Sequence, residues 1–244
     1  MCGRYTLTSQ AGLAEEFMLA VAEPAEASEW WRPRFNIAPT QPAPVVVARD
    51  GVRAVELMRW GLVPPWADGP AVGARMINAR VESLSQRPAF RDAVKHRRCL
   101  VAADGFYEWV TRGDGKAGKR VPMYLRPVPR RPVGFAGLWE RWRGPDGAWL
   151  VSFAIVTGPP NPLVEPIHDR MPVVVAPTHY ATWLAPGPLP ASVLAEVLAV
   201  PPVADWQAAE VAAAVGAPGH DAPDCVEPVA PAPPPEPPRQ GRLF

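Results

Sequence analysis

Short runs of β-branched and aromatic residues, several with alternating polar positions, recur along the chain and predict strands. They lie at residues 3–8, 45–48, 52–60, 99–109, 121–127, 133–142 and 149–157. Arg49-Asp50-Gly51 separates two of these runs and predicts a hairpin turn. A second Asp-Gly pair, inside 99–109, predicts a strand, a turn and another strand. One more strand is expected within residues 203–227.

Helical periodicity is confined to short segments. An apolar stripe predicts one early helix, capped by Thr8 or Ser9 and formed by Leu13, Phe17, Met18 and Val21. Two later helices are expected at 177–184 and 190–199. Strands outnumber helices and short turns join them. We therefore expect one α+β domain with a strongly curved, mostly antiparallel, barrel-like sheet and peripheral short helices.

Proline marks the end of this domain. The chain of 244 residues contains 34 prolines, and many of them gather near the C-terminus. Residues 229–244 lack apolar periodicity and cannot offset their ordering entropy by burial. We expect a folded domain over 1–228 and a disordered, proline-rich tail over 229–244.

Composition excludes several classes of protein. Hydrophobic residues make up 48% and the net charge is +1, so any nucleic-acid site must be a local basic patch. The cysteines are odd in number and widely spaced, which argues against a disulfide framework and for a reducing compartment. No CxxC occurs, and the spacing of the four histidines does not indicate metal ligands, so a zinc site is not expected. No cofactor is expected either.

The N-terminus shows no signal-peptide pattern, and no apolar run approaches membrane length. We expect a soluble, cytoplasmic protein with no membrane partner. We also expect a monomer.

Cys2 directly follows Met1, and initiator methionine is normally removed before so small a residue. Removal would leave an α-amine beside the thiol, a 1,2-aminothiol that condenses with an aldehyde to a five-membered thiazolidine. Both groups titrate within about a unit or two of neutral pH, so modest tuning makes them reactive. The alternative is that Cys2 is an ordinary buried cysteine.

Several further stretches carry candidate chemistry. The loop 60–69 holds Trp60, which we expect to pack into the core, and Trp66, for which base stacking and core packing are equally favoured. Residues 76–83 alternate apolar residues with Asn78, Arg80 and Glu82, which would share one face of a strand. That face is either solvated or the wall of a polar site.

A basic run lies around and after this stretch and is the best candidate for phosphate contacts, although an ordinary helix surface would look the same. It consists of Arg75, Arg80, Arg87, Arg91, Lys95, His96, Arg97 and Arg98. Glu108 lies between two aromatic residues, where burial would raise its pKa and suit it to acid–base work. His168 precedes Asp169 and is either a proton-transfer group or a capped core histidine.

Taken together, MCGRY, FNIAPTQ with WGLVPPWA, INARVES followed by GFYEW, and PIHDRMPV resemble the SOS response-associated peptidase (SRAP) family of abasic-site-processing proteins. The similarity extends in order from Met1 to about Pro228. It implies single-stranded DNA containing abasic sites as the partner, covalently trapped by a thiazolidine at Cys2. By motif position it assigns the catalytic residues as Cys2, Asn78, Glu108 and His168.

In the mechanism that the resemblance implies, Glu108 opens the sugar ring, the α-amine attacks the aldehyde, His168 donates a proton and the thiol closes the ring. Asn78 positions the adduct. If the thiol is slow, β-elimination cuts the strand. The expected phosphate contacts are Arg4, Arg80, Arg87 and Arg170, and weaker groove candidates are Asn36, Pro39, Trp66, Trp109 and Thr157. Gly216 departs from the polar residue expected near the end of the domain.

Two alternatives stay open. One is a cysteine-type peptidase that uses Cys2, His168 and Glu108, in which a nucleophile at the chain end suits self-removal of Met1. The other is a non-catalytic module that binds single-stranded DNA.

Overall fold

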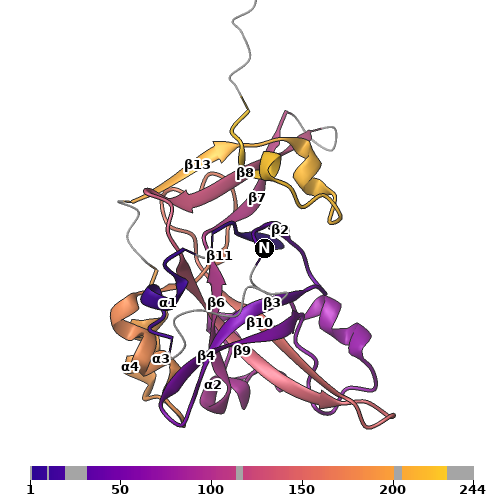
Figure 1. The fold of residues 1–244 in the computed structure, drawn as a ribbon, viewed down its shortest axis with the longest axis vertical. Coiled ribbons are helices and arrows are strands. Elements are labelled where there is room, and N and C mark those ends of the chain that lie inside the picture. Colours follow the sequence, from indigo (N-terminus) through magenta and orange to yellow (C-terminus); the bar gives the residue numbers. More distant parts are fainter. Residues whose placement is uncertain (1, 10, 20–31, 114–117, 201–204, 230–244) are drawn as a thin grey trace, which may run out of the picture.

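The computed structural model describes residues 2–9, 11–19, 32–113, 118–200 and 205–229. Five strands close into a barrel in the order β10–β4–β3–β6–β9–β10 (Figure 1). They are β3 (Pro42–Arg49), β4 (Val52–Trp60), β6 (Arg98–Ala103), β9 (Val133–Arg143) and β10 (Trp149–Gly158). Only the β4–β10 pair is parallel in this ring. The predicted barrel-like, mostly antiparallel sheet is thus confirmed.

A second antiparallel sheet lies at the top of the barrel in Figure 1. Its order is β13–β8–β7–β1–β2. These strands are β1 (Arg4–Leu7), β2 (Arg34–Ile37), β7 (Gly105–Arg112), β8 (Lys119–Pro127) and β13 (Trp206–Glu210). β1 lies between β7 and β2, so the first described strand of the chain is an inner strand of this sheet.

The remaining elements are short. Three strands extend the barrel: β5 (Asn78–Arg80), β11 (Met171–Pro172) and β12 (Val174–Val175). The α-helices are α1 (Leu13–Glu16), α2 (Ala93–His96), α3 (Tyr180–Leu184) and α4 (Ala191–Val197). The 3-10 helices are η2 (Pro70–Arg75), η3 (Val81–Ser83), η5 (Pro177–His179), η6 (Ala213–Gly216) and η7 (Pro223–Val226). None of the helices in the described ranges is long and apolar enough to cross a membrane.

The predicted hairpin at Arg49-Asp50-Gly51 is confirmed, with φ of 52° at Asp50 and 80° at Gly51. The Asp-Gly pair at 104–105 acts differently, because β6 and β7 do not pair with each other. Asp104 instead carries the chain from the barrel to the second sheet. Its buried carboxylate accepts hydrogen bonds of 2.5 and 2.8 Å from the Thr6 hydroxyl and the Thr8 N–H.

Two local predictions were wrong. The first helix begins after Gly12, which has φ 81° in the left-handed region, and neither Thr8 nor Ser9 caps it. The Thr8 hydroxyl is bound to Asp104, and the Ser9 hydroxyl accepts from the N–H of Ala11 before the helix. Met18 is 62% exposed and so lies off the buried stripe, and Val21 lies outside the described residues. The strand predicted at 76–83 covers only Asn78–Arg80, and Glu82 falls in η3.

The barrel is filled by aromatic and β-branched side chains. Trp60 is fully buried, stacks on Phe153 and meets Tyr5 edge-on. Its indole N–H donates to the carbonyl of Ile77 over 2.9 Å, which ties the end of β4 to the start of β5. Trp60 is therefore the core residue that the sequence predicted.

The loop 61–76 is held by a close approach of two glycines. Gly61 has φ 122°, and a Cβ added there would lie 2.6 Å from the carbonyl oxygen of Gly73. We expect Gly61→Ala to lower the free energy of unfolding by about 3 kcal/mol, since it combines left-handed strain with a backbone clash. Urea unfolding measures this, with Gly69→Ala as the control because nothing lies within 4 Å of a Cβ there. Equal stability of both variants would contradict the close packing.

Candidate functional site

Cys2 immediately precedes Gly3 and β1 and is fully buried. Its carbonyl oxygen accepts a 2.8 Å hydrogen bond from the side-chain amide of Asn78. Asn78 is held on β5, opposite Ile155 of β10 in a parallel pair. Among the described residues, the Asn78 Oδ1 atom is buried and has no hydrogen-bond partner. The nitrogen of the Asn78 amide thus anchors Cys2, which carries the candidate nucleophile. The oxygen of the same amide is available to accept a further hydrogen bond.

Glu108 and His168 come together from distant parts of the chain. Glu108 lies on β7, next to β1 in the second sheet, and is 2% exposed. His168 lies in the loop that follows β10, where Asn161 caps a turn by accepting from the N–H groups of Leu163 and Val164. The His168 Nε2 atom is 4.0 Å from a carboxylate oxygen of Glu108. The His168 Nδ1 atom accepts a 3.0 Å hydrogen bond from the backbone N–H of Arg170.

Burial dominates the electrostatics of these groups. It raises the pKa of Glu108 to about 7, an effect that Asp169 reinforces and Arg120 opposes. Burial lowers the pKa of His168 and raises that of Cys2 well above its usual value, and the charge of Glu108 adds to the rise at Cys2. At neutral pH the site therefore holds a neutral imidazole, a protonated thiol and a carboxyl group near its midpoint.

A hollow of about 390 Å³ opens beside Cys2. It is lined by Gly3, Arg4, Pro39, Glu108, Trp109, Arg120, His168 and Gly216. A second hollow, of about 420 Å³, is bordered by Asn78. Its lining residues are Trp66, Val72, Arg75, Met76, Asn78, Arg87, Pro88, Ala89 and Phe90. Cys2 lines neither hollow, but its chain neighbour Gly3 lines the first and Asn78, which binds its carbonyl, lines the second. Both hollows contain arginine and tryptophan side chains.

The structure distributes the residues predicted to contact DNA unevenly. Arg4, Pro39 and Trp109 line the first hollow, and Trp66 and Arg87 line the second. Trp66 is 60% exposed, so it does not pin its loop to the core. Arg80 is exposed at the end of β5, two residues after Asn78.

The other three candidates have protein partners or are buried. Arg170 is paired with Glu82 over 2.5 Å. Thr157 is fully buried in β10. Asn36 is fully buried, and its amide nitrogen donates to the carbonyls of Val215, Ala217 and His220. The structure does not bring Asn36 or Thr157 to the surface of either hollow.

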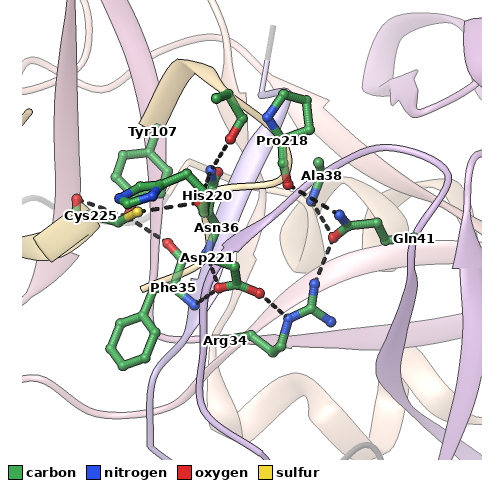
Figure 2. A network of polar contacts seen from close by, with 11 residues as sticks. Arg34, Phe35, Asn36, Ala38, Gln41, Tyr107, Pro218, His220, Asp221 and Cys225 are labelled. Carbon is green, nitrogen blue, oxygen red and sulfur yellow. Dashed lines mark hydrogen bonds and ion pairs between the residues drawn. The ribbon is translucent and has the colours of Figure 1, made fainter. Parts of the chain in front are cut away.

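Asn36 belongs to a clamp that fastens the segment 213–221 onto β2 (Figure 2). The carboxylate of Asp221 accepts from Arg34 Nε at 2.5 Å and from the N–H groups of Phe35 and Asn36 at 2.5 and 2.9 Å. Arg4 donates to the carbonyls of Val215 and Gly216, and burial lowers the pKa of its guanidinium. The clamp therefore builds the wall of the first hollow at Gly216.

Sequence reasoning missed Arg120 as a site residue. It lies on β8 opposite Thr111, and its guanidinium stacks over Trp109 at 5.7 Å. Its charge acts on both Glu108 and His168. The sequence could have indicated this position of Arg120 only through the register of the hairpin formed by 105–112 and 119–127. In that register Arg120 is the diagonal cross-strand neighbour of Trp109.

Comparison with known proteins gives a consistent assignment. A family model described as SOS response associated peptidase (SRAP) matches residues 1–218. The chain is 36% identical over 224 residues to the abasic site processing protein YoqW of Bacillus subtilis, covering 91% of this chain and 97% of that protein. It is 30% identical over 192 residues to the abasic site processing protein YedK of Escherichia coli, covering 75% of this chain and 79% of that protein.

Solved structures share the fold. A protein from Bacteroides thetaiotaomicron superposes with a TM-score of 0.78 at 22% identity, covering 94% of this chain and all of the other. A protein from Bordetella bronchiseptica superposes with a TM-score of 0.69 at 27% identity, covering 86% of this chain and all of the other. The match of the family model over most of the chain, together with the identity to YoqW, shows that this protein is a member of the SOS response associated peptidase (SRAP) family.

Proposed function

We propose that this protein processes abasic sites in DNA and traps them covalently through a thiazolidine at Cys2. Its membership of the SRAP family and the names of its relatives support action on abasic sites. The observation that carries the chemistry is the surroundings of Cys2: Asn78 holds its carbonyl, and the next residue, Gly3, lines the first hollow together with Glu108 and His168. Removal of Met1 would expose the α-amine at this point.

The proposed reaction starts from the closed sugar of the abasic site. Glu108 takes the proton of the C1′ hydroxyl and returns one to the ring oxygen, which opens the ring to an aldehyde. A pKa of about 7 lets this carboxyl both accept and donate near neutral pH. The α-amine of Cys2 attacks the aldehyde carbon, and the resulting carbinolamine loses one water to form an imine.

The thiol then completes the adduct. Its sulfur adds to the imine carbon while its proton passes to the nitrogen, so the overall reaction joins protein and DNA with the loss of one water. Burial of the thiol keeps it protonated until the imine is close by. Because the pKa of His168 is lowered, we assign the first proton donation to Glu108 and give His168 the transfer of protons between Glu108 and the adduct.

We propose single-stranded DNA as the substrate form. An exposed tryptophan in a recess with arginines can stack only on a base that is free of its neighbours. Arg80 and Arg87 are the proposed phosphate contacts. Arg4 and Arg170 would join them if Arg4 exchanged its bonds to the carbonyls of Val215 and Gly216, and Arg170 its pairing with Glu82, for a phosphate. Strand cleavage by β-elimination is the proposed side reaction when ring closure is slow.

The test uses untagged protein and a single-stranded oligonucleotide with one abasic site. We expect an adduct that survives denaturation and has the mass of protein plus DNA minus one water. Cys2→Ala should abolish that adduct, because the ring cannot close without the thiol. If mass spectrometry confirms that Met1 is absent and no adduct forms, the thiazolidine mechanism is wrong.

The same samples discriminate the two alternatives. Cleavage of an unrelated peptide, lost in Cys2→Ala, would favour a peptidase. DNA binding that Cys2→Ala leaves intact, without any adduct from the wild type, would favour a simple binding module. An N-terminal tag should block crosslinking while leaving DNA binding unchanged, because the α-amine is then unavailable.

Trp66 offers a separate prediction about affinity. We expect Trp66→Ala to weaken binding of single-stranded DNA by about 5- to 150-fold, the equivalent of stacking on one base. Trp149→Ala is the matched control, because Trp149 is equally exposed, at 60%, but lines neither of these hollows. Fluorescence anisotropy with an unmodified oligonucleotide measures both. Equal losses in the two variants would exclude a specific role for Trp66.

A further inference from the structure

A group of potential metal ligands lies at the end of the clamp, and none of its members lines either hollow. His220, Asp224 and Cys225 each offer one ligand atom, and these atoms lie within 4.8 Å of one another. The Nε2 atom of His220 is 2.9 Å from both carboxylate oxygens of Asp224. The Sγ atom of Cys225 is directed back toward the carbonyl of His220, at 3.5 Å. Three different donor types thus converge within one short segment.

We propose that His220, Asp224 and Cys225 bind a divalent transition-metal ion of the zinc type. Imidazole nitrogen, carboxylate oxygen and thiolate sulfur are the ligands that zinc takes in proteins, with bond lengths of about 2.0–2.3 Å. The three donor atoms lie within 4.8 Å of one another, so small side-chain movements would bring them to those distances from one ion. A thiolate among the three selects zinc over magnesium and calcium, which prefer oxygen alone. Three protein ligands leave the fourth tetrahedral position to water.

The surroundings suit a metal site that is half open. Cys225 is fully buried in a small apolar cluster with Tyr107, Tyr124, Val211 and Val215. The imidazole of His220 and the carboxylate of Asp224 are 37% and 51% exposed, so a cation can reach them from solvent. When the metal–sulfur bond forms, the thiol gives up its proton to the solvent, and no oxidation is required.

The backbone of the same segment carries the clamp. The carbonyl of His220 accepts from the amide of Asn36, and the next residue, Asp221, binds Arg34 (Figure 2). A metal that joins position 220 to positions 224 and 225 would close the segment around Asp221. Because the metal binds the folded segment, it should raise the thermal unfolding midpoint in proportion to the logarithm of its concentration.

This site departs from the expectation that no zinc site is present. The spacing His-x3-Asp-Cys contains no CxxC and no second histidine, so the sequence pattern alone does not point to a metal. The approach of the three donor atoms comes from the turn at 217–220 and from η7, which bring Asp224 and Cys225 back toward His220.

The test uses the full chain carrying Cys2→Ala, because a free N-terminal aminothiol would itself chelate metals. Titration with Co²⁺ should give one equivalent, with tetrahedral d–d bands and a thiolate-to-cobalt charge-transfer band. Zn²⁺ should displace the cobalt without further proton release, whereas Zn²⁺ added to the metal-free protein should release about one proton per site, seen by calorimetry in two buffers. Adding Cys225→Ser or His220→Ala should weaken binding by about 100-fold or more, because loss of an outer partner alone costs 10–100-fold.

His179→Ala is the matched control. His179 also faces a carboxylate, Glu196 at 3.3 Å, but this pair belongs to no group of three potential ligands in the described chain. Its removal should leave the cobalt spectrum unchanged. Asp224→Asn and His220→Ala alter exposed positions and keep the test valid if Cys225→Ser fails to fold.

Three results would overturn the proposal: no charge-transfer band, a band that persists in Cys225→Ser, or affinity that is equal in His220→Ala and His179→Ala. The measurement involves no DNA and no intact Cys2, so its outcome is independent of abasic-site trapping.

Discussion

Replacing Glu108 with Gln is expected to slow crosslinking to an abasic site by about 100- to 10,000-fold, the usual contribution of a positioned acid–base group. Gln keeps the size and the buried position of the side chain but cannot exchange a proton with the sugar. Single-turnover kinetics with a denaturing-gel readout measures the rate. DNA affinity should change little, since Glu108 is not a proposed phosphate contact.

The pH profile separates a proton-transfer role from a structural one. In the wild type the protonated form of Glu108 is lost above about pH 7, while the α-amine, with an ordinary pKa of about 7.7–8.0, gains reactivity as pH rises. The rate should therefore pass through a maximum. Glu108→Gln should retain only the rising limb that reports the amine.

Stability supplies an independent check. The folded state keeps a proton on Glu108 that the unfolded chain releases above about pH 4.5, so the free energy of unfolding should fall as pH rises from about 4.5 to about 7. The fall attributable to this group is at most about 3 kcal/mol, and Glu108→Gln should remove it. Glu140→Gln is the control, because Glu140 is buried and paired with Arg97 but lines neither hollow described above.

If Glu108→Gln crosslinks abasic-site DNA at the wild-type rate, the carboxyl group of Glu108 takes no part in the mechanism.

Replacing Asn36 with Ala is expected to destabilise the protein by about 3 kcal/mol. The amide nitrogen lies 2.7 to 3.1 Å from three carbonyls of the segment 215–220, and its loss removes these hydrogen bonds, at about 1 kcal/mol each, from a largely buried place. Crosslinking should also fall, because the segment carries the Gly216 wall of the first hollow.

The comparison of stability with DNA affinity decides what Asn36 does. If it holds the clamp, Asn36→Ala lowers the urea midpoint, and the loss of crosslinking grows with temperature. If it contacts DNA directly, affinity falls while the urea midpoint stays constant. Gln86→Ala, which removes an exposed amide, is the control and should change neither quantity.

Most strands were predictable from the sequence because each carries its own signal. Alternating or continuous apolar runs located β3, β4, β8, β9 and β10, and Asp50-Gly51 located the tight turn of the first hairpin. The closure of the barrel was expected only in general terms. The parallel pairing of β4 with β10 joins residues about ninety positions apart, and no local pattern records such a contact.

The early helix shows why local signals fail. Thr8 has the side chain of a good N-cap, but it bonds to Asp104, a partner 96 residues away in sequence. The tertiary hydrogen bond uses the hydroxyl that the cap would need, and the helix starts later, after Gly12. The sequence likewise predicted a local role for Asp104, as a turn residue between paired strands. In the structure Asp104 instead connects the barrel to the second sheet.

The sequence by itself determined the candidate chemistry: a cysteine behind the initiator methionine, and motifs that carry an amide, a carboxyl and an imidazole. Reactivity is a property of residue types, so it can be read from the chain. Only the tertiary structure decided which side chains meet. In the folded protein the Asn78 amide binds the carbonyl of Cys2, and Glu108 lies 4.0 Å from His168. Asn36, expected in the DNA groove, belongs instead to the clamp. The physical reason is that distances and burial, and therefore pKa values, depend on contacts between segments far apart in the sequence.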